Sequence, residues 1–205
     1  MRWSEMEHSQ PRLAELGRRR LLAPGVVLVV TIRRDGSARL SPVEPFLMDG
    51  DLWLSMMWQS RKAADLLRDP RVLVHNVITN RDGGEGEFKL RGTAQAETDQ
   101  PTQERYATEV GQQLGWHPQP GRFHLFRIDI HEVTFIRYDD ATGDQHVALW
   151  PRGDEFIRRG TSATSVGAPE PIRDLLERRG QEPAAGGGGV GVGPGPDSDP
   201  DSGAD

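Results

Sequence analysis

The sequence predicts a mainly β protein, an antiparallel β-barrel with flanking helices. Apolar, β-branched residues fill short runs such as 26–32 and 72–78, which is typical of strands. Asp-Gly pairs at 35–36 and 49–50 indicate hairpin turns between successive runs. Because hairpin connections dominate, an antiparallel sheet that curls into a barrel is favoured over a parallel sheet.

The chain is expected to begin with a helix and a buried strand. Leu13 and Leu16 lie on one face of a helix over residues 9–22, and Pro24-Gly25 follows as a stop signal. The run 26–32 is continuously apolar and β-branched. This pattern predicts a strand that is buried on both faces.

Two strands and a short helix come next. The strand at about 38–45 contains Pro42, which cannot donate to a ladder and so indicates a sheet edge, a bulge or a place where a ligand meets free backbone. Residues 52–58 alternate as a strand does, and residues 61–68 form a short helix. Its apolar positions, which we expect to face the core, are Ala63, Leu66 and Leu67.

The remaining elements are strands on either side of one longer helix. We expect strands at 72–78 and 88–96, a helix at 100–114, one bent strand or two at 123–137, and a final hairpin of 145–150 and 155–159. The polar, glycine-rich loop at 80–87 is a candidate rim element.

A single domain over residues 1–180 is expected, and it ends in a helix at about 171–179. From residue 181 onward the chain is mostly Gly, Pro, Asp and Ser. Such a segment buries too little apolar surface to offset its ordering entropy, so we predict a disordered tail over 181–205.

Charge and hydropathy exclude two classes of partner. The formal net charge is −6, but residues 181–205 carry five acidic residues and no Lys or Arg, which leaves about −1 on residues 1–180. That near-neutral balance argues against nucleic-acid binding. No apolar run approaches the roughly 20 residues that cross a bilayer. Residues 1–10 also lack an apolar signal core, so a cytoplasmic protein is expected.

Conventional catalytic and metal-binding motifs are missing from the sequence. It has no cysteine, and its six histidines lack metal-ligand spacing. There is no Gly-x-Ser-x-Gly nucleophile motif. We therefore expect no metal site and name no catalytic residue.

The run Ser60-Arg61-Lys62 is the main functional signal. It follows the strand at 52–58 and opens the helix that Asp69-Pro70 closes. Free N–H groups and the dipole at a helix start favour an anion, and two cations there are unfavourable unless an anion compensates them. A phosphate group is the natural ligand, while an ordinary surface helix is the alternative. Walker and dinucleotide-binding glycine motifs are missing, so the phosphate is expected to belong to another cofactor.

The segment 52–72 around this run resembles the pyridoxamine 5'-phosphate oxidase-like, or flavin split-barrel, family. There a strand ends in a turn, Ser-Arg-Lys opens a helix, and a Pro-Arg-Val-like run begins the next strand. The resemblance extends over about residues 10–160. Its further motifs are Asp35-Gly36, Ser41-Pro42-Val43-Glu44-Pro45, Arg91-Gly92 and His124-Leu125-Phe126-Arg127-Ile128.

This resemblance implies a split β-barrel of the flavin-binding type that binds FMN and forms a homodimer, with each flavin at the subunit interface. Arg61 and Lys62 would contact the cofactor phosphate, and Ser60 would cap the helix or donate to the same oxygens. The residues that would line the isoalloxazine ring are Arg39, Ser41, Val43, Met56, Met57 and Trp58. The partner chain would supply Trp150.

Structural alternatives stand beside these roles. Arg39 and Ser41 also fit an exposed strand face, the segment 56–58 also fits barrel core, and Trp150 also fits an ordinary packed hairpin. We expect an FMN-dependent oxidoreductase acting on a small molecule, since the flavin ring itself carries the electrons. The Arg-Leu-His-type C-terminal run of the vitamin-processing oxidases is missing, so oxidation of pyridoxamine phosphate is not expected.

Two other functions fit the same fold. A reductase that uses the deazaflavin coenzyme would need an open channel, which the loop at 80–87 would border. A non-enzymatic haem or flavin carrier would need, for haem, a single axial histidine such as His75 or His124.

Overall fold

The computed structural model describes residues 1–81 and 84–172. The helices are α1 (Trp3–Ser9), α2 (Pro11–Gly17), the π-helical η1 (Arg18–Leu22), α3 (Arg61–Arg68) and α4 (Gln100–Leu114). The strands are β1 (Val27–Ile32), β2 (Ala38–Val43), β3 (Pro45–Met48), β4 (Asp51–Met57), β5 (Arg71–Asn76), β6 (Glu87–Glu97), β7 (Phe123–Tyr138), β8 (Gln145–Trp150), β9 (Glu155–Ser162) and β10 (Ser165–Pro171).

These strands form an antiparallel sheet in the order β10-β9-β8-β7-β6-β5-β1-β2. β4 joins the sheet through β7 and pairs on its other side with β3. The predicted mainly β, antiparallel fold is therefore confirmed. The strands that the structure describes leave the barrel open, in agreement with a split barrel.

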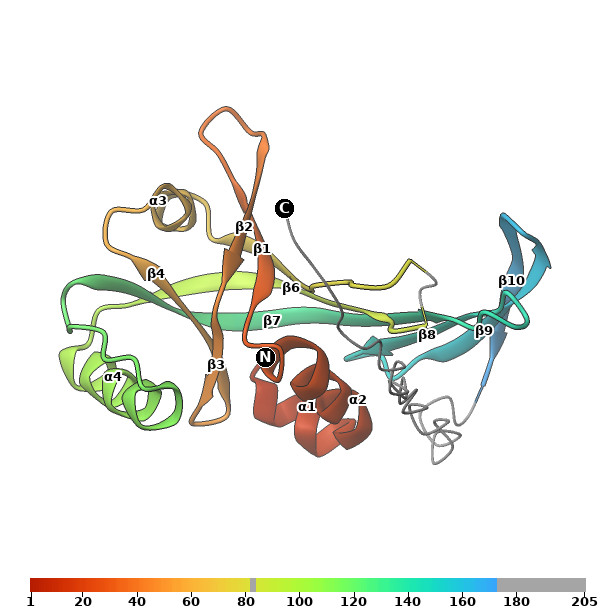
Figure 1. Ribbon diagram of the computed structural model, residues 1–205, viewed down its shortest axis with the longest axis horizontal. Helices are drawn as coiled ribbons and strands as arrows, with labels where there is room; N and C mark the ends of the chain where they lie inside the picture. The colour runs from red at the N-terminus through yellow and green to blue at the C-terminus, as the bar shows by residue number, and fades with distance from the viewer. Residues whose placement is uncertain (82–83, 173–205) are drawn as a thin grey trace, which may run out of the picture.

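The sheet is elongated, and the elements of interest gather at one end of it. Figure 1 shows β6 and β7 running along the molecule, with α3 and α4 toward one end and β8, β9 and β10 toward the other. β4 is buried over most of its length because it lies between two apolar clusters. Leu54 and Met56 belong to the main core, whereas Trp53 belongs to a smaller cluster with Tyr106 and Phe123.

Several local predictions are confirmed. α3 and α4 begin and end as the sequence indicates, and 123–138 is one continuous strand. The turn at Asp49 and Gly50 has positive φ at both positions (55° and 76°), as a tight hairpin with this sequence requires. β2 ends the main strand path, which explains how it accommodates Pro42.

The N-terminal helix and β1 differ from the prediction. Helical structure already begins at Trp3, and Gln10, with a ψ of 69°, separates α1 from α2. Pro11 opens α2 because it has no N–H to leave unsatisfied. β1 alternates between buried and half-buried residues, so the expectation of burial on both faces is wrong. One of its faces is turned away from the core.

The inward face of α3 is also rotated relative to the prediction. Ala63 and Leu66 are buried as expected, but Leu67 is 56% exposed and Asp65 is 4% exposed. The prediction that Leu67 faces the core is therefore wrong. Asp65 takes its place because polar groups on β1 and β2 satisfy its carboxylate.

The C-terminal expectations are tested only in part. The predicted final hairpin is confirmed as β8 and β9, although β9 continues to Ser162, and β10 then extends the sheet beyond it. Pro171 is the last residue of β10, and the rest of the predicted helix at 171–179, from residue 173, lies outside the described residues, as does the tail at 181–205.

Candidate functional site

The start of α3 has the geometry of a capped helix. Ser60 has extended backbone dihedrals (φ −65°, ψ 148°), and its hydroxyl accepts a hydrogen bond from the Ala63 N–H at 3.4 Å. Ser60 therefore caps the helix, which is one of the two roles that the family resemblance implied for it. Arg61, the first helical residue, is exposed, and Lys62 is half-buried.

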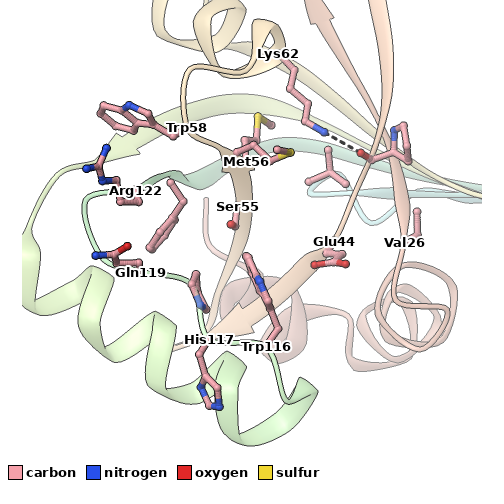
Figure 2. A pocket seen from close by; sticks show the side chains of 15 residues that line it. Val26, Glu44, Ser55, Met56, Trp58, Lys62, Trp116, His117, Gln119 and Arg122 are labelled. Carbon is pink, nitrogen blue, oxygen red and sulfur yellow. Dashed lines mark hydrogen bonds between the residues drawn. The ribbon is translucent and has the colours of Figure 1, made fainter.

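Lys62 reaches from α3 across to β2. Its Nζ donates to the carbonyl oxygen of Pro42 at 3.1 Å. Figure 2 shows this bond at the rim of a cleft of about 760 Å³, a size typical of small-molecule sites. The cleft is bounded by β2, by the end of β4 and by the segment that follows α4. Its floor is mainly apolar.

Five of the predicted cofactor residues line this cleft: Val43, Met56, Met57, Trp58 and Lys62. They come from β2, β4, the turn after β4, and α3, which the sequence-based expectation had grouped together. Met57 and Trp58 are 78% and 46% exposed, so both offer free apolar surface beside the cations. The opening of the cleft and the start of α3 thus adjoin each other.

Arg39 lies outside the cleft lining and belongs to an ion-pair network instead. Its Nε donates to Oδ2 of Asp65 at 2.6 Å, and the same oxygen accepts from Thr31 Oγ1 at 3.1 Å. Arg68 donates to the other oxygen at 3.2 Å. Burial alone would raise the pKa of Asp65, but the hydrogen bonds from these three residues outweigh it and lower that pKa. The network fixes α3 against β1 and β2.

Ser41 and Trp150 are likewise not among the residues that line the cleft. Ser41 is half-buried on β2, opposite Val29 of β1. Trp150 is 3% exposed within the main core, and its indole N–H donates to Ser9 Oγ at 2.9 Å. In this position its ring offers little surface to a ligand, which favours the packing role.

The wall opposite α3 was missed by the sequence analysis. It consists of Trp116, His117, Pro118, Gln119, Arg122 and Phe123, and the lining is completed by Val26, Pro42, Glu44 and Ser55. Figure 2 shows Trp116 and Glu44 facing the cleft below Lys62. The exposed Trp116, which follows the helix end at Gly115, is a sequence signal that could have indicated a binding surface.

Below the cleft, α4 closes the smaller apolar cluster. Burial raises the pKa of Tyr106 to about 12, while a hydrogen bond with Ser55 acts in the opposite direction. The phenol therefore stays protonated at neutral pH. Within residues 1–81 and 84–172, no cluster of three or more potential metal ligands occurs. None of the helices described is both long and apolar enough to cross a membrane.

Comparison with known proteins places these features in a family. The sequence model described as pyridoxamine 5'-phosphate oxidase matches residues 14–137. The solved structure of the conserved hypothetical protein Rv2991 from Mycobacterium tuberculosis is similar, at 19% identity and a TM-score of 0.51, over 61% of this chain and 82% of that one. No curated protein matches the chain.

Two further solved structures have TM-scores of 0.48. General Stress Protein 26 from Bacillus anthracis shares 18% identity over 62% of this chain and 93% of that one. HutZ, a heme storage protein from Vibrio cholerae, shares 16% identity over 60% of this chain and 90% of its own.

Proposed function

The chain belongs to the pyridoxamine 5'-phosphate oxidase family, and from that membership we propose that it binds FMN in the cleft beside α3 and acts as an oxidoreductase on a small molecule. The FMN phosphate would lie at the start of α3, where Arg61 and Lys62 supply charge and Ser60 caps the helix. The ring would extend into the cleft over Val43, Met56 and Trp58.

One observation carries this proposal: the cations at the start of α3 are available to an external anion. In the part of the chain that the structure describes, no carboxylate pairs with Arg61 or Lys62, although Arg39, Arg68 and Arg71 are each paired with an aspartate. Lys62 borders the cleft, so the charge adjoins a cavity. Free helix N–H groups add to the same potential.

The lining of the cleft also suits a flat, amphipathic ring. Val43 and Met56 are buried and apolar, and Trp58 offers an aromatic face. β2 has β1 as its only strand neighbour among the described strands, so part of its backbone is available to hydrogen-bond a ring edge. Bound FMN would supply the electron or hydride transfer, and the residues here bind and orient it.

The proposal includes a homodimer. On the outer face of β1 and β2, Ala38, Leu40 and Pro42 are exposed, and Leu40 is 61% exposed. Leu28 and Val30, their neighbours on β1, are half-buried on that same face. A contiguous apolar strip of this kind favours association with another surface, and we propose a second copy of the chain.

The test compares FMN with riboflavin, which lacks the phosphate. Replacing Arg61 and Lys62 together by alanine should weaken FMN binding by at least about tenfold, because each charge-assisted hydrogen bond is worth roughly 1.5–3 kcal/mol. Riboflavin affinity should change by less than about twofold, since the ring contacts stay intact. Calorimetry or flavin fluorescence measures both affinities.

The matched control is Arg71→Ala, which removes one cation beyond the far end of α3, where Arg71 pairs with Asp69. It should leave both affinities unchanged. Equal losses for FMN and riboflavin in the double variant would contradict the phosphate assignment.

The same titrations distinguish the other cofactors. Tighter binding of the deazaflavin coenzyme than of FMN would replace FMN in the proposal. In the structure, Asn80 and Arg81 of the loop at 80–87 line a separate pocket with Tyr138, and neither lines the cleft beside α3.

A Soret shift with added haemin would favour a haem carrier. Both candidate axial histidines already have partners: His75 contacts the Asn76 carbonyl, and His124 accepts from a backbone N–H.

A further inference from the structure

The turn between β4 and α3 has an unusual backbone. The Ser60 N–H donates to the carbonyl of Met57 at 3.0 Å, which closes a four-residue turn. Gln59 within it has a φ of 58°, a left-handed conformation that non-glycine residues rarely adopt. Such a conformation persists only where neighbouring contacts hold it. This turn sets the position of Ser60, Arg61 and Lys62.

His124 on β7 supplies those contacts. Its Nε2 accepts a hydrogen bond from the Gln59 N–H at 3.2 Å. Its ring stacks on the Trp58 ring, with centroids 4.6 Å apart and planes within 9°. His124 therefore contacts both central residues of the turn, from a strand whose position is fixed by pairing with β4.

The hydrogen bond determines the form of the imidazole. Because Nε2 accepts a hydrogen bond, it carries no proton, and the ring is neutral with its hydrogen on Nδ1. Burial lowers the pKa of His124. Beside His124 lies a second cleft of about 540 Å³, to which α3 contributes Leu67, α4 contributes Gln103 and β6 contributes Glu97. Among the described residues that line it, Glu97 is the only carboxylate.

We propose that His124 is a positioning residue, whose neutral imidazole holds the β4–α3 turn in the conformation that presents Arg61 and Lys62 to the FMN phosphate. The inference rests on the proposed function for its ligand. Protonation of Nε2 removes the acceptor and places a second N–H against that of Gln59, so the turn is released. Phosphate-dependent affinity then declines as the pH falls below the ordinary histidine range, and ring-dependent affinity is retained.

Two substitutions separate the contributions of the histidine. His124→Gln keeps an acceptor at a similar reach but removes the stacked ring and the titration, whereas His124→Phe keeps a ring and removes the acceptor. The readout is the ratio of the riboflavin dissociation constant to the FMN dissociation constant, which isolates the phosphate. His131→Phe, on the same strand at a half-exposed site, is the control.

At about pH 7.5, His124→Phe should lower this ratio by about tenfold, the equivalent of one hydrogen bond, and His124→Gln should lower it by less than about threefold. On acidification to about pH 5.5, the ratio should fall more steeply for the wild type than for His124→Gln. The second ionisation of the phosphate, near pH 6, affects all variants equally and cancels in that comparison.

Amide exchange of Gln59 tests, without any flavin, whether His124 holds the β4–α3 turn. In the ligand-free protein at one pH, this N–H should exchange at least about tenfold faster in His124→Phe than in His124→Gln, and in the wild type its protection factor, the intrinsic exchange rate divided by the observed rate, should be smaller at low pH. Equal Gln59 exchange in both variants would overturn the inference. If the wild type itself failed to distinguish FMN from riboflavin while Gln59 exchange behaved as expected, the proposed function would be refuted, but the role of His124 in holding the turn would be retained.

Discussion

At the scale of single residues, Asp65 decides where α3 lies. It is buried, yet its two oxygens accept hydrogen bonds from Thr31 of β1, Arg39 of β2 and Arg68 of α3. One carboxylate therefore connects two strands and the helix. The resemblance to the flavin split-barrel family assigned Arg39 to the cofactor ring. Its partner lies 26 residues further on, and such pairing cannot be deduced from spacing.

Removal of this carboxylate should cost much of the stability of the protein. Asp65→Ala leaves Arg39, which is 21% exposed, without its partner, and breaking a buried pair typically costs about 3–5 kcal/mol. Asp69→Ala, which breaks the exposed pair with Arg71 at the end of the same helix, should cost no more than about 1 kcal/mol. Urea unfolding at neutral pH measures both changes.

The effect of Asp65 should also depend on pH, in a direction that its lowered pKa determines. A carboxylate with a lowered folded-state pKa contributes fully above its ordinary value of about 3.9 and loses that contribution as the pH falls through the folded value. The difference between wild type and Asp65→Ala should therefore shrink in acid. A difference that is constant down to about pH 2.5 would contradict the role of the charge.

At the scale of elements, the sequence predicted helices better than it predicted their faces. α3 and α4 have clear boundaries because Ser60 and Asp99 cap their first turns and a proline or glycine follows or ends them. The inward face of α3 was misassigned because hydropathy alone favours Leu67 over Asp65. The break between α1 and α2 at Gln10 was missed because Pro11 both ends one helix and begins the next.

β6 carries a bulge at Arg91 and Gly92, a pair that the sequence analysis noted only as a family motif. The register against β7 shifts between these two residues, and a Cβ on Gly92 would lie 2.2 Å from the Asp129 carbonyl oxygen. Gly92→Ala must therefore displace backbone in the longest strand pair and should destabilise the protein by roughly 2–4 kcal/mol. Thermal unfolding measures the change.

Gly167→Ala is the matched control for this substitution. Gly167 lies on β10, and its Cβ would meet the nearest heavy atom at 3.6 Å, an ordinary contact. The control should shift the stability by less than about 0.5 kcal/mol. Similar losses in the two variants would contradict the close approach at the bulge as the cause of the effect.

At the scale of the whole molecule, only one of the two walls of the cleft could be predicted from the sequence. Motifs near α3 located one wall, because cap, cations and strand are contiguous in the sequence. The other wall, which includes Trp116 and Arg122, is brought there by the path of the chain after α4. The strands β8 to β10 lie beyond the matched family region, which ends at residue 137. Local sequence pattern predicted β8 and β9 but neither β10 nor the way in which these strands extend the sheet from β7.

The proposed dimer gives the last prediction at this scale. Leu40→Asp places a charge in the centre of the exposed apolar strip on β2 and should convert the protein from a dimer to a species of the chain mass, 22.8 kDa. Since Leu40 is already 61% exposed in the single chain, the fold should tolerate the change. Sedimentation equilibrium measures the mass, and thermal unfolding checks that the monomer is folded.

Leu114→Asp makes the same change at a leucine of similar exposure, 58%, at the end of α4, and should leave the mass unchanged. If the flavin lies at the subunit interface, Leu40→Asp should weaken FMN and riboflavin to the same extent, because it removes contacts to the ring and leaves the start of α3 intact. This outcome differs from the phosphate-selective loss expected on replacement of Arg61 and Lys62. A monomeric wild type, or a dimeric Leu40→Asp variant with unchanged affinities, would refute association through this strip.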